Sequence, residues 1–214
     1  MGVLNGLLYL LGFVLLQLNV KRNGVVLSAT FMRLGLLVPM IVSVFVFREM
    51  PEAFQWIGFL LAVAAIILIN LEKEQTTMKF KGGLFLLLLA GGSADTMSKL
   101  FEEIGQSQLS EQFLFYTFLS AFLLCAGLAC FRKEKPGWTE VFYGLLVGIP
   151  NYFSARFLLR ALGKLPAVLV YPTYSVATIV VVTLAGVFIF RERLGRRQKL
   201  ALCVILAALV LLNR

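Results

Sequence analysis

Histidine is absent from this chain, and only 14% of its 214 residues carry a charged side chain. The lack of histidine removes the commonest metal ligand and the usual acid–base group near neutral pH. The three cysteines, Cys125, Cys130 and Cys203, lie in apolar segments without metal-ligand spacing, so we interpret them as small apolar side chains. The sequence also has no Walker-type phosphate loop. We therefore predict no metal, no cofactor and no direct use of ATP.

The scarcity of charge is matched by an excess of apolar residues. The chain is 60% hydrophobic and 13% aromatic, with a mean hydropathy of +0.90. A soluble domain of this size could not bury so much apolar surface. Runs such as residues 84–89 do not alternate as barrel strands do, whereas a helix of about 20 apolar residues crosses a bilayer. The predicted fold class is an all-α protein that crosses the cell membrane several times.

The apolar segments divide the chain into eight predicted transmembrane spans, separated by short polar turns. The first has no basic residues before it and no convincing cleavage site, so we interpret it as a membrane helix and not a signal peptide. The polar stretch 72–81 is the predicted linker between a three-span part, residues 1–71, and a five-span part, residues 82–214. The predicted spans are 2–20, 24–47, 53–71, 82–101, 110–131, 138–159, 167–190 and 196–213.

Basic residues dominate the charge, with a net value of +9. They lie between apolar runs and not on an aromatic-interleaved soluble face, so the expected partners are the lipid bilayer and a small molecule, with no nucleic acid. Most Lys and Arg residues follow the first, third, fifth and seventh spans. Because basic loops are retained in the cytoplasm, this distribution predicts that both termini lie outside.

Two segments of the chain repeat one another 143 residues apart: Val44–Glu49 before one apolar span and Val187–Glu192 before another. Polar residues match in the same ungapped register, namely Lys21 with Lys164, Thr30 with Thr173, Gln55 with Gln198, and Asn70 with Asn213. This agreement predicts an internal repeat. An odd number of spans separates equivalent helices, so they cross in opposite directions, as in the inverted repeats of secondary transporters. Duplication retained only for packing is the alternative.

The repeated Phe-x-Glu turn, with a Gln near the start of the closing helix, resembles the EamA-type branch of the drug/metabolite transporter superfamily. The segment Ala161–Ala167, followed by Val170, Tyr171 and Pro172, is similar to the second half of that family. The resemblance implies a carrier of small organic metabolites or drugs that works by alternating access. It also implies a plan of five plus five helices, of which the first two have no counterpart here, and termini on the inside, contrary to the charge distribution.

Three explanations of the shorter plan stay open: a natural short form, a fragment that starts at an internal Met, or a homodimer or partner-dependent assembly. Glu49 and Glu192 are the acidic positions that match the family motif. Each precedes a helix, whose N-terminal dipole favours a carboxylate. We therefore expect capping and interfacial anchoring in preference to direct substrate contact.

Charged residues well inside a bilayer are costly and need a reason. Arg33 and Asp95 lie near the middle of predicted spans, and Lys99 follows Asp95 by four residues on the same helix face. We predict that Arg33 and Asp95 pair across the two halves or line a cavity, where Asp95 would carry a proton. The alternative is a structural ion pair, with Lys99 extending to the membrane surface.

Polar residues also gather in the sixth and seventh spans. They are Asn151, Tyr152, Ser154, Arg156, Tyr171 and Tyr174, and together with Arg33, Asp95 and Lys99 they are the candidate substrate or proton pathway. Tyr152, Arg156 and Arg160 share one helix stripe. Pro39 and Pro172 each free a backbone carbonyl within a span, which is typical of a broken or bent helix. Close helix contacts are predicted at Gly12, Gly35, Gly58, Gly91, Gly92, Gly127 and Gly186.

The leading hypothesis is a secondary transporter, coupled to protons or to exchange, with Asp95 as the coupling group. A non-transporting accessory subunit that kept the repeat is the second hypothesis. An intramembrane enzyme is the third, and the sequence offers it no nucleophile–base pair.

Overall fold

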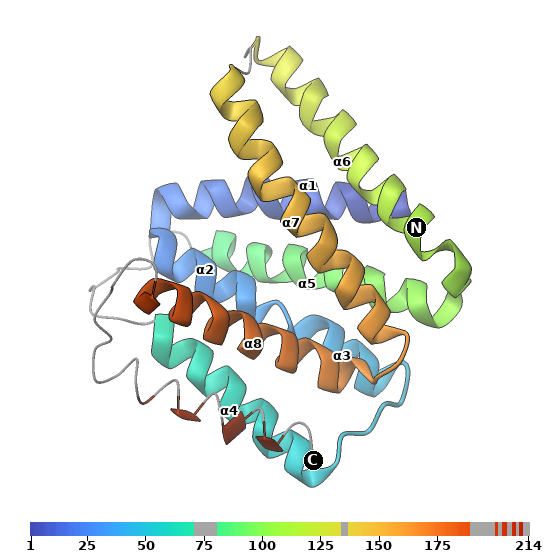
Figure 1. The fold of residues 1–214 in the computed structure, drawn as a ribbon, viewed down its shortest axis with the longest axis vertical. Coiled ribbons are helices and arrows are strands. Elements are labelled where there is room, and N and C mark those ends of the chain that lie inside the picture. The colour runs from blue at the N-terminus through green and yellow to red at the C-terminus, as the bar shows by residue number, and fades with distance from the viewer. Residues whose placement is uncertain are drawn as a thin grey trace.

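The structure is a computed structural model that describes residues 1–70, 81–133 and 137–188, with positions 200, 203, 204, 207, 208, 210 and 211 of the last segment. The described residues form helices and no strand, so the predicted all-α class is confirmed. The helices are α1 (Gly2–Asn23), α2 (Val25–Leu34), α3 (Leu37–Phe45), α4 (Ala53–Asn70), α5 (Lys81–Ile104), the 3₁₀ turn η1 (Ser107–Leu109), α6 (Ser110–Phe131), α7 (Trp138–Leu162) and α8 (Ala167–Phe188) (Figure 1).

Four helical segments are long and apolar enough to cross a membrane: α1, the α2–α3 stretch from Leu27 to Phe45, α5 and α6. Shorter apolar helical stretches cover Ala53–Ala65 in α4 and Ala167–Val181 in α8. The first seven predicted spans thus correspond to helices of this multi-pass membrane protein. Most of the eighth span, most of the linker 72–81 and the Glu192 turn lie outside the described residues.

Equivalent helices of the predicted repeat run in opposite directions. In Figure 1, α1 runs toward the left-hand face and its equivalent α7 toward the right-hand face. Likewise, α2 and α3 run toward the right-hand face and their equivalent α8 toward the left-hand face. The right-hand face carries the N-terminus, the 46–52 turn and the 163–166 turn, and we call it the N-terminal face. The other is called the opposite face, and it holds the α1–α2 junction and the start of α5.

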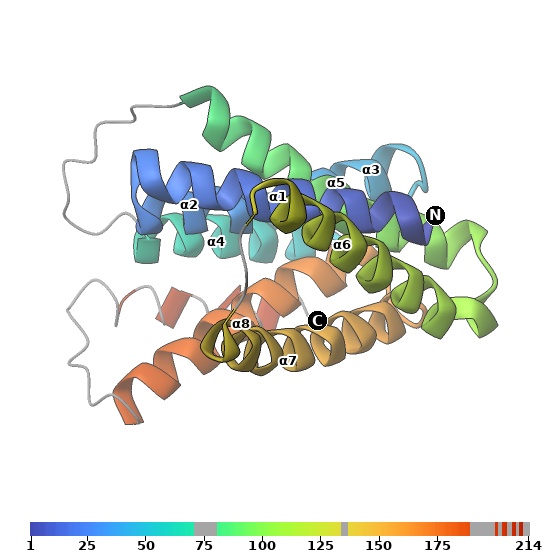
Figure 2. The same cartoon turned by 90° about the horizontal axis from the view of Figure 1, so that it is seen from above.

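The helices form two layers (Figure 2). One contains α1 to α5 and the other α7 and α8, with α6 running obliquely between them. Although α5 begins the five-span part of the chain, it packs against α1, α2 and α3. The main apolar core lies where α3 and α4 meet α8, around buried Met40, Phe59 and Tyr171. The two layers are therefore joined by α3 and α4, which pack against α8, and by α5, which packs against α7, whereas α2 packs against α1, α4 and α5.

The second predicted span is divided at Gly35–Leu36 into α2 and α3. Pro39 has no N–H to donate to the Gly35 carbonyl, and the Val38 N–H takes that carbonyl instead at 3.0 Å. The bend brings Gly35 against Gly92 of α5, where an added methyl group would overlap the Gly35 carbonyl oxygen. The predicted break at Pro39 and the close contact between these two glycines are both found.

Pro172 behaves differently from Pro39. Helix α8 continues unbroken from Ala167 to Phe188, so of the broken or bent helix predicted at Pro172 the break is not found. The residue lies near the start of the helix, and only one carbonyl, that of Val168, loses its usual donor. A proline at this position disturbs the helix less than one at its centre.

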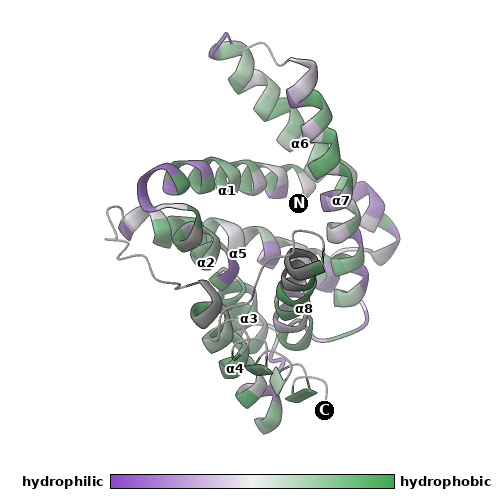
Figure 3. Cartoon of the chain, turned by 60° about the vertical axis from the view of Figure 1, so that its left-hand side comes forward, coloured by the Kyte–Doolittle hydropathy of each residue, from purple (hydrophilic) through white to green (hydrophobic). Residues whose placement is uncertain are grey.

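The far ends of α6 and α7 form an arm that extends beyond α1 (Figures 1 and 3). Residues 137–150 of α7 are all exposed, and large apolar side chains such as Phe131, Phe142 and Val147 cover the arm. Figure 3 shows that the arm is largely hydrophobic. Such a surface is suited to lipid or to other membrane helices.

Candidate functional site

Two adjoining cavities lie between the layers, and we call them together the central cavity. One measures about 200 Å³ and is lined by α1, α2, α5, α7 and α8; the other measures about 340 Å³ and is lined by α2, α5, α7 and α8. They share four lining residues, Met32, Asp95, Leu158 and Tyr174. Five helices from both predicted halves thus supply the walls of one site.

The charged residues of the central cavity are Arg33 and Asp95. Asp95 lines both cavities from α5, and Arg33 lines the larger one from α2. Within the described parts of the chain, neither side chain forms an ion pair or a hydrogen bond with another side chain. The predicted direct Arg33–Asp95 pair is therefore wrong: both residues line the same open space without contact.

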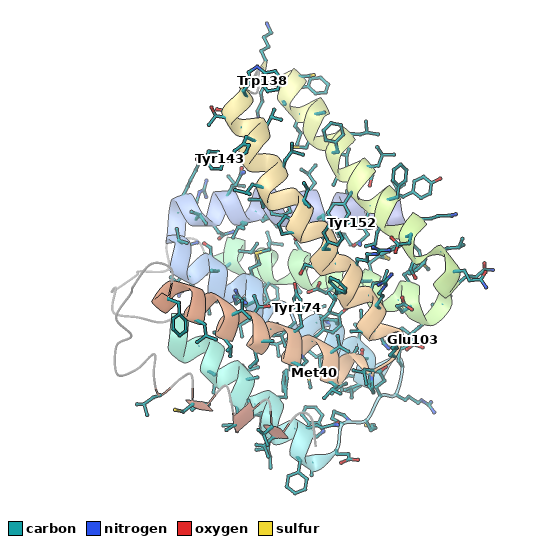
Figure 4. The ribbon with its side chains drawn as sticks, viewed as in Figure 1. Met40, Glu103, Trp138, Tyr143, Tyr152 and Tyr174 are labelled. Atoms are coloured by element: carbon teal, nitrogen blue, oxygen red, sulfur yellow. The ribbon has the colours of Figure 1, made fainter. Side chains whose placement is uncertain are left out.

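Tyrosine hydroxyls join the helices around this space. The Tyr171 hydroxyl donates to the backbone carbonyl of Asp95 at 2.6 Å and so links α8 to α5. The Ser154 and Tyr174 hydroxyls are 2.6 Å apart and link α7 to α8. Figure 4 shows Tyr174 near the middle of the molecule. Asn151 lines the smaller cavity, so the candidate residues Asn151, Ser154, Tyr171 and Tyr174 all line the central cavity.

Lys99 belongs to a different cluster, nearer the N-terminal face. Its ammonium group lies 2.6 Å from Glu49 Oε1 and 2.5 Å from Glu103 Oε1, and the residue is only 1% exposed. The ring of Phe47 lies 5.6 Å from the same nitrogen. Lys99 is thus absent from the lining of the central cavity, and the alternative that it extends to the surface is wrong, because two carboxylates satisfy its charge inside the protein.

Glu49 completes that cluster from the other side. Its Oε2 accepts a hydrogen bond of 2.8 Å from the backbone N–H of Ala167, the first residue of α8. The sequence predicts that Glu49 caps the helix that follows it, but α4 is served by Gln55, whose Oε1 accepts from the Glu52 N–H at 3.1 Å. Glu49 thus caps a helix of the other layer, as its place at the positive end of the α8 dipole favours.

The stripe of Tyr152, Arg156 and Arg160 faces away from the central cavity, toward α6. The Tyr152 hydroxyl donates to Glu111 Oε2 at 2.9 Å, and Arg156 Nη2 lies 2.6 Å from Glu111 Oε1. Arg160 Nη2 lies 3.8 Å from the same oxygen. The shared stripe is confirmed, but Glu111 holds Tyr152 and Arg156 outside the cavity lining.

The glycine predictions have mixed outcomes. A side chain at Gly12 or Gly127 would meet nothing within 4 Å, so the predicted close contacts there are wrong. Gly6, which the sequence analysis missed, lies against α6, where an added methyl would overlap Ser120 and the Thr117 carbonyl. Helix α1 therefore crosses α6 at Gly6 and leaves Gly12 free to line the cavity.

Several cavity residues were not predicted: Tyr9 and Phe13 on α1, Met32 on α2, and Ser175 and Thr178 on α8. Tyr9 had a usable signal, since a hydroxyl near the centre of an apolar span needs a polar neighbour or a cavity. Met32 and Phe13 had none, because apolar side chains in a span are equally suited to lipid contact. Glu111 and Glu103 were missed because their partners depend on the fold.

The central cavity can bind a small molecule through a carboxylate, a guanidinium, an amide and several hydroxyls between aromatic walls. Within the described ranges, no group of three or more Cys, Asp or Glu residues is placed to hold a metal ion.

Comparison with known proteins agrees with this architecture. A Haemophilus influenzae protein of uncharacterised function is 24% identical over 212 residues, which cover 95% of this chain and 72% of that protein. The model of the EamA-like transporter family matches residues 81–214, more than half of the chain. That stretch contains α5 to α8 and with them Asp95, Ser154 and Tyr174 of the cavity wall. The chain therefore belongs to the EamA-like transporter family.

Proposed function

We propose that this protein is a secondary transporter that moves small organic metabolites or drugs across the cell membrane by alternating access, with the central cavity as its substrate site. Membership of the family supports a membrane transporter of the drug/metabolite type. The observation that carries the assignment is the presence of Arg33 and Asp95 in one cavity between the two layers.

Charged side chains at this depth cost several kcal/mol unless something compensates them. A structural ion pair would compensate both at once, but these two side chains do not contact each other. Water and a bound polar substrate are the remaining sources of compensation. A substrate that supplies both an acceptor for Arg33 and a donor for Asp95 would be bound far better than an apolar one.

Asp95 is the proposed coupling group. Asp95 lines both cavities that make up the central cavity. A proton on its carboxyl group would therefore stay with the binding site when the central cavity closes toward one face of the membrane and opens toward the other. Exchange of one substrate for another is the alternative source of energy. In both cases the carboxyl group must change its proton or its partner during the cycle.

The test is uptake by the purified chain in proteoliposomes that carry a pH gradient. A mixture of unlabelled small metabolites is added outside the proteoliposomes. The external solute is then removed, and the contents of the proteoliposomes are analysed by mass spectrometry. We expect saturable accumulation of at least one compound, reduced at least about tenfold by Asp95→Asn. Tyr152→Phe is the matched control, because Tyr152 faces Glu111 and not the cavity. Folded protein without uptake of any compound would contradict the proposal.

A second candidate function is a membrane subunit that works only with a partner. The apolar arm of α6 and α7 favours it, since the described parts of the chain leave residues 137–150 exposed and a partner could cover them. The same reconstitution separates the two functions. Uptake by the single purified chain supports the transporter, whereas uptake that appears only after addition of a membrane extract supports the partner-dependent subunit.

A further inference from the structure

We propose that Glu49 is a latch that closes the central cavity toward the N-terminal face and must let go when the cavity opens there. This inference rests on the proposed alternating-access function. It assigns a mechanical role to the glutamate of the Phe-x-Glu turn, where capping of its own helix was expected.

The latch lies one helical turn outside the cavity on two helices. On α5, Asp95 lines the cavity and Lys99 follows four residues later, toward the N-terminal face. On α8, Tyr171 lines the cavity and Ala167 precedes it by four residues, again toward that face. A helical turn rises about 5.4 Å, so the Glu49 cluster forms the next layer of side chains beyond the cavity.

Glu49 reaches both helices from a third element. It belongs to the turn after α3, and its two carboxylate oxygens have separate tasks. Oε1 accepts from Lys99 on α5, and Oε2 accepts from the Ala167 N–H of α8. Because one carboxylate joins three elements, separation of α8 from α3 and α5 at this face must break at least one of its charge-assisted bonds.

Neighbouring contacts close the same end of the cavity. Phe47, two residues before Glu49, lies near the Lys99 ammonium group. Phe101 of α5 packs in one buried cluster with Leu159 of α7, and α3 packs against α8. Toward the opposite face the second span continues as α2, which packs within its own layer. The packing of α3 on α8 and of Phe101 with Leu159 thus joins the layers at the N-terminal face, and α4 adds further contacts with α8.

Glu103 makes the latch reversible. It lies on α5 with Lys99, at i+4, and its bond to the lysine does not cross between helices. When Glu49 withdraws, Lys99 keeps Glu103 as its counter-charge and is not left alone in the interior. An unpaired buried charge would cost several kcal/mol, so Glu103 lowers the free energy needed to open the latch.

The experiment measures access to the cavity from each face. Ser154→Cys, a cavity position, is the reporter in a chain whose Cys125, Cys130 and Cys203 are replaced by Ser. Membrane vesicles of both orientations are treated with a membrane-impermeant maleimide, and the labelling rate is followed. The latch variants are Glu49→Ala and Glu49→Gln, and the matched control is Glu103→Gln, which removes a carboxylate from the same cluster without removing the inter-helix bond.

We expect the parent chain to be labelled slowly from the N-terminal face. Glu49→Ala should raise that rate by at least about tenfold, because it removes two charge-assisted bonds that join α5 and α8 to the turn after α3. Glu49→Gln keeps an acceptor and should give a smaller increase, and Glu103→Gln should leave the rate at or below the parent value. Gel filtration in detergent confirms that each variant is folded.

Two results would overturn the latch. One is fast labelling of the parent chain from the N-terminal face, and the other is equal rates for folded Glu49→Ala and Glu103→Gln. Both are independent of transport, because labelling needs no substrate. If the protein does not transport but the variants are labelled in the expected order, the latch stands and the proposed transport function falls. If it transports normally but Glu49→Ala and Glu103→Gln are labelled at equal rates, only the latch falls.

Discussion

The close crossing of α2–α3 with α5 makes Gly92→Ala the most informative stability experiment. The added methyl group would overlap the Gly35 carbonyl oxygen and the side chain of Val38. The carbonyl is fixed by its hydrogen bond from the Val38 N–H within the bend that Pro39 imposes, so neither neighbour can withdraw alone. The two helices must separate to admit the methyl group.

The magnitude follows from two opposing effects. Overpacking of a closely packed contact costs about 1–3 kcal/mol. Replacing Gly by Ala in a helix gains up to about 1 kcal/mol of intrinsic propensity. Gly127→Ala isolates the second effect, because nothing lies within 4 Å of an added methyl there. The difference in unfolding free energy between the two variants should therefore be about 1–3 kcal/mol.

The assay is thermal unfolding in detergent, followed by the fraction of protein that stays monodisperse on gel filtration. For a chain of this size, about 1 kcal/mol lowers the melting temperature by about 2–4 °C. Gly92→Ala should melt below the parent protein and Gly127→Ala at or above it. If Gly92→Ala melts with or above Gly127→Ala, the close contact of α2–α3 with α5 is refuted.

Further predictions concern the cavity and its walls. Arg33→Leu should abolish uptake but change the unfolding free energy by less than about 1 kcal/mol, because no ion pair is lost. Coupling of several kcal/mol between Arg33→Leu and Asp95→Asn in a double-mutant cycle would contradict this. Tyr171→Phe removes the hydrogen bond to the Asp95 carbonyl and should lower the free energy of unfolding by about 0.5–1.5 kcal/mol. The control Tyr143→Phe, at an exposed position, should leave it unchanged, and equal melting temperatures of the two variants would refute the contribution of the bond. Gly6→Ala should weaken the α1–α6 crossing by about 1–3 kcal/mol, and an unchanged melting temperature would show that the crossing is loose.

The sequence predicted the helices well because lipid imposes a strong pattern. Apolar runs bounded by polar turns located α1, α4, α5 and α6 within a few residues, and Pro39 located the bend of the second span. Pro172 leaves α8 unbroken, since the effect of a proline depends on its distance from the helix start. The direction of each helix followed from counting spans, and the inverted arrangement of α1 and α7 agrees with it.

Several residues that line the central cavity could be selected from the sequence, but the pairings of the charged residues could not. Asn151, Ser154, Tyr171 and Tyr174 could be selected because a polar residue in a span needs a partner or a cavity. The partner of Lys99 could not be predicted, because Glu49 lies 50 residues away and reaches it only through the packing of α3 on α5. Glu111 likewise removes Tyr152 and Arg156 from the cavity through a contact between α6 and α7.

The measurement that tests the central claim most directly asks whether blocking the cavity stops transport. In the cysteine-free chain, Ser154→Cys places a thiol in the cavity wall, and Phe153→Cys places one on the exposed surface of the same helix turn. Both variants are reconstituted, modified with a bulky maleimide and assayed for uptake. We expect modification to abolish uptake by the Ser154→Cys protein and to leave uptake by the Phe153→Cys protein unchanged. Full uptake by the completely modified Ser154→Cys protein would contradict the claim that substrate passes through this cavity.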